Sequence, residues 1–213
     1  MRLTRKLVLT ALAATALLAA IATTSAAREF ETSETRIRTV FRPLILRSSS
    51  GDSVTCTVTL EGSFHYRTIR KVEGSLIGYI TRAIVETPTC RSSPTAGITI
   101  AALTETLPWH ITYLDFSGTL PNVTLRIRIN RFSFNFINVP IIGRCRYTAS
   151  TNYIVGGPAG REITEGTRSA TLIMENGVRI RSETFGCPEF QTESAATPVT
   201  IQGGTTAVTI RLI

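Results

Sequence analysis

The chain has 213 residues and a formal net charge of +8 at pH 7, from 23 lysines and arginines against 15 acidic residues. Hydrophobic residues make up 43% of it, which excludes a disordered or fibrous protein and is enough to build one buried core. The basic balance favours polyanionic partners. No nucleic-acid-binding signature accompanies the charge, so we expect no nucleic acid partner.

The first 27 residues have the pattern of a secretory signal peptide. Arg2, Arg5 and Lys6 precede an uncharged, Ala/Leu-rich stretch over 7–22, and small residues follow up to Ala27. This order is typical of a cleaved export signal, and an apolar stretch of about 16 residues is shorter than the roughly 20 that span a bilayer. We therefore expect a signal peptide helix at 1–27 and a mature protein, secreted or held in the cell envelope, without a transmembrane segment. The Ala-rich leader favours a bacterial source.

Four cysteines follow, and an even number after an export signal predicts two disulfides. We favour the sequential pairing, Cys56–Cys90 and Cys145–Cys187, because each pair begins on an expected strand and ends in a turn-like context. No Cys-x-x-Cys, His-x-His or His-Glu-x-x-His spacing occurs, so we expect neither a metal nor a cofactor.

Alternation of apolar and polar residues dominates the rest of the chain, after a short polar arm at 28–35. At 53–61, every second residue from Val54 to Leu60 is apolar, which predicts a half-buried strand. The same alternation occurs at 123–130, 132–136 and 206–212. Further strand candidates are 36–41, 64–70, 76–85, 97–103, 110–114, 145–153, 169–175 and 178–184.

Turn residues separate these runs. Asn176-Gly177 lies between two of them and predicts a hairpin. We find no convincing helical period after the leader. About ten to twelve short strands with frequent turns predict an all-β fold, a single-domain antiparallel β-sandwich over 36–213, with a closed β-barrel as the alternative.

The segment around the only tryptophan offers one candidate ligand site. Trp109 and Tyr113 could stack on a sugar ring, with His110 and Asp115 as polar partners. In the competing interpretation, Trp109, Ile111 and Tyr113 line the core face of a strand. A secreted hydrolase would use the same neighbourhood, with His110 and Asp115. We name no catalytic residue and favour a protein that is not an enzyme.

Arg-x-Arg pairs offer the second candidate, because residues i and i+2 of a strand share a face. Such pairs occur at 36/38, 126/128, 144/146 and 179/181. Neighbouring strands would combine them into a basic face able to bind acidic polysaccharide, wall polymer or anionic headgroups. The alternative is a solvated face balanced by glutamates. The expected ligand-binding residues are therefore Arg126, Arg128, Arg144, Arg146, Arg179, Arg181, Trp109 and His110.

These observations favour a non-catalytic binding module of the extracellular space or cell envelope, with acidic glycans or cell-wall polymers as partners. A secreted hydrolase and a barrel carrying a lipid or another small ligand are the alternatives. The pattern leaves the oligomeric state open.

Overall fold

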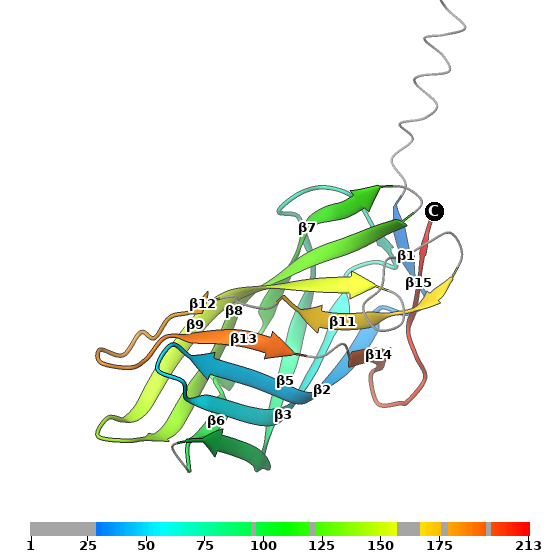
Figure 1. The fold of residues 1–213 in the computed structure, drawn as a ribbon. Coiled ribbons are helices and arrows are strands. Elements are labelled where there is room, and N and C mark those ends of the chain that lie inside the picture. The colour runs from blue at the N-terminus through cyan, green and yellow to red at the C-terminus, as the bar shows by residue number, and fades with distance from the viewer. Residues whose placement is uncertain (1–28, 95–96, 120–121, 157–166, 176–178, 195–196) are drawn as a thin grey trace, which may run out of the picture.

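A computed structural model describes residues 29–94, 97–119, 122–156, 167–175, 179–194 and 197–213 (Figure 1). The expected signal peptide lies outside these residues. The described chain is almost entirely strand, with one short 3-10 helix at Thr104–Thr106. Among the described residues, no helix is long and apolar enough to cross a membrane.

The strands fall into a long-stranded first part and a short-stranded last part. The first part comprises β1 (Phe30–Thr32), β2 (Arg36–Ser48), β3 (Ser53–Phe64), β4 (Thr68–Ile69), β5 (Leu76–Ser93), β6 (Thr99–Ala102), β7 (Trp109–Thr119), β8 (Asn122–Val139) and β9 (Gly143–Gly156). The last part comprises β10 (Arg168–Ser169), β11 (Thr171–Met174), β12 (Arg179–Ile180), β13 (Phe190–Ser194), β14 (Thr197–Ile201) and β15 (Thr209–Leu212).

All strand pairs are antiparallel and form two sheets. The large sheet has the order β12-β13-β2-β14-β11-β9-β8-β7-β5-β3, with β6 attached to β8. Because β2 also pairs with β3, hydrogen bonds join the two flanks of this order, and the sheet folds over into two packed layers. The small sheet has the order β10-β15-β1-β4. The expected all-β sandwich is therefore confirmed, with two sheets in place of a single closed barrel.

A bulge in β8 joins two runs that we expected to be separate strands. Ile127 and Ile129 are buried, and so are Phe132 and Phe134, although the two sets are out of phase by one residue. The register shifts between Ile129 and Phe132, where Arg131 has φ 65°. One extra residue in a strand reverses which side chains face the core, so the bulge lets both apolar sets point inward.

Aromatic rings run through the core as a continuous series. Trp109 packs against Phe132, with ring centroids 4.8 Å apart, and Phe136 stacks on Phe190 at 4.3 Å. Tyr147 is also buried, and its hydroxyl donates a hydrogen bond of 2.7 Å to the carbonyl oxygen of Pro188. These contacts connect strands of both layers, so the core is one unit.

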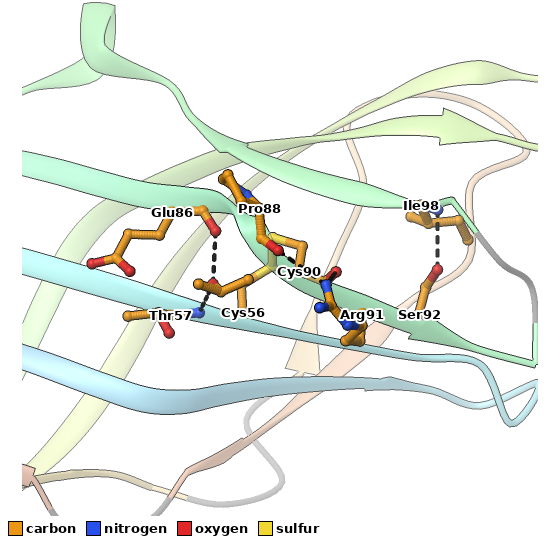
Figure 2. Close-up of a disulfide and its surroundings, with 9 residues drawn as sticks. Cys56, Thr57, Glu86, Pro88, Cys90, Arg91, Ser92 and Ile98 are labelled. Carbon is orange, nitrogen blue, oxygen red and sulfur yellow. Dashed lines mark hydrogen bonds between the residues drawn. A yellow bond between two sulfur atoms is a disulfide. The ribbon is translucent and has the colours of Figure 1, made fainter.

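Both disulfides form with the sequential pairing that the sequence favours, Cys56–Cys90 and Cys145–Cys187. Figure 2 shows the first, beside a bulge in β5: Thr55 pairs with Arg91 and Thr57 with Glu86, so residues 87–90 lie outside the ladder. The Thr89 hydroxyl takes the place of a backbone partner, since it accepts from the Thr57 amide at 2.9 Å and donates to the Glu86 carbonyl at 2.7 Å. The disulfide closes the base of this bulge.

Three local predictions are wrong. The polar arm at 28–35 contains strand β1, and Phe30 is fully buried. The hairpin around Asn176-Gly177 is not formed, because β11 pairs with β9 and β14 whereas β12 pairs with β13; the turn residues themselves lie outside the described chain. Of the strand expected at 178–184, the structure has only Arg179–Ile180. Alternation indicates which runs can form strands, but it does not identify the partners of those strands.

Replacing Tyr147 by Phe tests the buried hydroxyl. Burial raises the pKa of Tyr147, so the neutral hydroxyl is favoured in the folded state. Its contribution to stability is complete below about pH 10, the ordinary pKa of tyrosine, and is lost as pH rises beyond it. We expect Tyr147→Phe to lower the free energy of unfolding by about 1 kcal/mol at pH 8, and this difference to shrink or reverse above pH ~10. Urea unfolding at a series of pH values measures both; a constant difference at every pH would contradict the prediction.

Removing each disulfide tests the chain-entropy contribution. The bridges span 34 and 42 residues, and loops of similar length should stabilise by similar amounts, roughly 3–4 kcal/mol each. The double variants Cys56→Ser/Cys90→Ser and Cys145→Ser/Cys187→Ser should therefore lose comparable stability in urea. A loss confined to one of them would show that local packing, and not loop closure, sets the effect.

Candidate functional site

Trp109 belongs to the core and does not contribute to a ligand site. Its side chain is 1% exposed, and the indole N–H donates to the Thr106 hydroxyl at 2.8 Å. This burial agrees with the interpretation in which Trp109 lines the core face, because alternation along β7 turns Trp109 inward and leaves the adjacent His110 half-buried at the outer face. The two residues proposed as partners therefore lie on opposite sides of one strand.

The Arg-x-Arg pairs do not gather on one face, and one arginine of each pair contacts an acid. On β8, Arg126 contacts Asp115 at 2.8 Å. Arg146 on β9 contacts Glu183 at 3.0 Å, and Arg181 contacts Glu189 at 3.5 Å. The 144/146 and 179/181 pairs lie near one another because an isolated antiparallel β-bridge joins the backbones of Tyr147 and Ser182. The 126/128 pair is distant from them. Arg128 lies seven residues, or about 23 Å along β8, from Asn135, which pairs with Arg146 on β9.

The fourth pair, 36/38, is part of a second charged arrangement on the outside of β2, β3 and β5. The Glu61 carboxylate is 9% exposed and lies between Arg38 at 3.4 Å and Arg82 at 3.3 Å. Cross-strand register places these three side chains in one row. Two guanidiniums neutralise the nearly buried carboxylate, so these three residues stabilise the surface of the sheet and do not present charge for a ligand.

The fold brings the two histidines together through one tyrosine. His65 follows β3, Tyr79 lies on β5 and His110 on β7; the ring centroids are 5.1 Å apart for His65 and Tyr79, and 5.4 Å for Tyr79 and His110. The ring of Tyr66 continues the series 6.5 Å from His65. We call these four residues the aromatic row; it crosses the outer face of β3, β5 and β7.

Two glycines set the position of the aromatic row. A Cβ at Gly62 would lie 2.1 Å from the Tyr79 carbonyl oxygen, and a Cβ at Gly78 would lie 2.3 Å from that of Ser63. Only glycine allows the β3 and β5 backbones to approach this closely. A hydrogen bond of 2.8 Å from the His65 amide to the Ile77 carbonyl holds the start of the row against β5.

One end of the aromatic row opens into a cleft of about 750 Å³, which we call the 65–77 cleft. That volume lies in the range of sites for small organic ligands. The loop between β4 and β5 forms part of this cleft, and two hydrogen bonds join it to β7. The Gly74 amide donates to the Tyr113 carbonyl at 2.9 Å, and the Tyr113 amide donates to the Ser75 carbonyl at the same distance. The side chains that line the cleft include His65, Tyr66, Arg67, Thr68, Arg70, Val72 and Leu76.

The cleft combines an exposed aromatic ring with two cations. Tyr66 is 76% exposed. Arg67 is 3.9 Å from Glu34, and Arg70 is 3.8 Å from Glu29. These separations exceed the 2.7–2.9 Å of a charge-assisted hydrogen bond, so both guanidiniums keep donors for an anionic ligand.

Polar side chains continue the surface at the other end of the aromatic row. Asn130 of β8 is paired with His110, and its amide donates to the Thr112 hydroxyl at 3.1 Å. Arg128 pairs with Thr112 and is half-buried. Of the residues nominated from sequence, His110 and Arg128 therefore lie beside this surface, while Arg144, Arg146, Arg179 and Arg181 lie elsewhere.

Sequence analysis missed most of this site. Tyr66, Tyr79, Arg67 and Arg70 were not nominated, although the run of His65, Tyr66 and Arg67 at the beginning of the strand expected at 64–70 is a local signal. Alternation does not mark Tyr79 as outward-facing, because the β3–β5 register shifts at Glu61/Gly62.

The cavity in the core is too small for a lipid. It is lined by aliphatic side chains, Phe64 and two threonines, and its volume of about 30 Å³ is the scale of a water molecule. No group of three or more His, Cys, Asp or Glu side chains within the described ranges could hold a metal ion.

Comparison with known proteins adds no assignment. No protein-family model, curated protein or solved structure matches the chain. The fold and the two disulfides fit a compact extracellular β-domain, and disulfides are a feature of non-reducing environments.

Proposed function

We propose that this protein is a non-catalytic glycan-binding module of the extracellular space or cell envelope, and that its ligand is an acidic polysaccharide. The single observation that carries the proposal is the junction of the aromatic row with the 65–77 cleft, where exposed rings and guanidiniums lie side by side. The proposed mature protein is released from its leader by signal cleavage.

The aromatic row suits a chain of sugar rings. A pyranose presents an apolar C–H face that packs against an aromatic ring, while its hydroxyls need hydrogen-bonding partners. The rings of the row are 5.1–6.5 Å apart and turned by 55–90° relative to their neighbours, so a sugar unit can stack on one ring face while a neighbouring ring presents its edge. Imidazole and phenol groups also offer polar atoms at the ring edges.

The cations of the cleft explain a preference for acidic sugars. A guanidinium binds a carboxylate or sulfate through two parallel hydrogen bonds. Arg70 has an 82% exposed side chain, so an incoming anion can replace its long contact to Glu29 with little reorganisation.

The hydrolase alternative receives less support from the same surface. Glycoside hydrolysis uses two carboxyl groups on either side of the bond that is cleaved. Among the described lining residues of the cleft, Glu29 is the one acid, and it faces Arg70. Asp115 contacts Arg126, and no described contact joins it to His110.

A binding experiment tests the proposal with variants at both parts of the site. Isothermal titration with an oligouronate or sulfated oligosaccharide should show that Tyr66→Ala weakens binding by about 1 kcal/mol, or roughly fivefold. Arg70→Gln should weaken binding of the acidic ligand and leave binding of a neutral oligosaccharide of the same length unchanged. Added salt should reduce the difference between the two ligands.

Phe185→Ser is the matched control, because Phe185 also exposes a whole aromatic ring but lies outside the aromatic row and the cleft. It should bind the glycan as the unmodified protein does. Equal affinity of all variants, or an equal loss in the control, would overturn the proposal.

A further inference from the structure

A second exposed surface lies where the β8–β9 hairpin meets the 181–189 loop, and it does not depend on the glycan proposal. We call residues 139–143 and 181–189 the distal tip. In Figure 1 the β8–β9 hairpin projects away from the end of the molecule that carries β1, β15 and the C-terminus. Ile141 and Phe185 at the distal tip are fully exposed, and Ile142 is partly exposed.

Covalent and hydrogen-bonded links hold the two segments of the distal tip together. The Cys145–Cys187 disulfide joins β9 to the loop two residues beyond Phe185. The Glu183 amide donates to the Arg146 carbonyl at 2.8 Å. A Cβ at Gly186 would lie 3.7 Å from the Cδ1 atom of Ile142, so the backbone of the loop lies against the hairpin side chain. The exposed apolar side chains of the two segments are therefore held close together.

The conformation of Ile141 is unfavourable for the isolated domain. Its φ is 69°, a left-handed conformation in which a β-branched side chain meets steric repulsion and which Asn or Gly adopts readily. Full exposure of the side chain adds a second unfavourable feature. A turn selected for stability alone would carry Asn or Gly here, so Ile141 has a role outside the folded core.

The charge around the distal tip is positive along the hairpin. Between residues 116 and 161 the chain has no acidic residue. Arg144 directly follows the turn, is exposed, and contacts no acid among the described residues. Arg146, two positions further, contacts Glu105 and Glu183. The 181–189 segment carries charges of both signs, since Arg181 contacts Glu189 at 3.5 Å, so the cation that the proposal uses is Arg144.

We infer that the distal tip inserts into the outer region of an anionic lipid bilayer. Ile141, Ile142 and Phe185 enter the boundary between headgroups and acyl chains, and Arg144 binds lipid phosphate. A projecting apolar point buries little area against a flat protein surface, whereas fluid lipid closes around it. Arg144, which contacts no acid among the described residues and directly follows the apolar side chains, gives the charge complementarity that an anionic bilayer requires.

Co-sedimentation of the exported protein with vesicles tests this inference. Vesicles of phosphatidylcholine with phosphatidylglycerol should bind the protein more strongly than phosphatidylcholine alone. Phe185→Ser should lower the partition coefficient about tenfold or more, because burial of that side chain is lost. Arg144→Gln should remove much of the gain from phosphatidylglycerol and leave binding to phosphatidylcholine unchanged.

Ile141→Asn is the decisive variant, because Asn tolerates the backbone conformation. We expect its thermal stability to equal or exceed that of the unmodified protein while its vesicle partition falls at least about fivefold. Val72→Ser, which changes an exposed aliphatic side chain of the 65–77 cleft, is the matched control and should bind vesicles normally.

A gain-of-signal variant gives an independent measurement. The emission of Phe185→Trp should shift to shorter wavelength with phosphatidylglycerol vesicles and be quenched by lipids brominated in the acyl chains. The inference is overturned if the unmodified protein does not sediment with these vesicles, or if Ile141→Asn and Phe185→Ser sediment as it does. It is also overturned if these variants instead abolish a concentration-dependent dimer, since a second copy would then cover the tip.

Discussion

Strand β2 is hydrogen-bonded along both edges, and the arrangement of the two layers depends on this. One edge pairs with β3; the other pairs first with β14 and then with β13. The change of partner occurs across Arg42 and Pro43, where the β2–β3 register also shifts. Proline lacks the N–H that a regular ladder needs, so it is tolerated at an irregularity. A strand fixed on both edges cannot slip, and it therefore fixes the positions of β3 and, through it, of β5 and β7.

Register then separates the core from the proposed binding surface. On β5 and β7, Tyr79 is opposite His110, and the next pair along is Ile80 with Trp109. The first pair faces outward and the second faces the core, although all four residues lie within one step of one another. A slip by one residue would bury the histidine and expose the tryptophan. Because the apolar side chains of these strands pack into the aromatic core, the alternate side chains face outward and form the proposed glycan surface.

Sequence alone predicted the fold class, the disulfide pairing and most strand positions, because all three follow from local patterns. Alternation predicted the positions of β3 and β8. The disulfide pairing was predicted because each pair has its first cysteine on an expected strand and its second in a turn-like segment. Partner choice was not local: Asn176-Gly177 looked like a hairpin, yet β11 and β12 pair with different strands. The site was missed for the same reason. His65, Tyr79 and His110 come from three strands or strand ends, and an extra residue in β5, Thr81, decides which way Tyr79 points.

The pairing of β1 with β15 has a kinetic meaning. Glu29 and Ile213 exchange two backbone hydrogen bonds of 2.8 Å, and Phe30 is opposite Leu212. Strand β1, whose Phe30 is fully buried in the finished domain, therefore cannot complete its pairing before β15 is present. Contacts this distant in sequence close late and slow folding. A growing chain consequently carries an incomplete core until β15 has been synthesised, and in that interval it is most exposed to aggregation, proteases and chaperones.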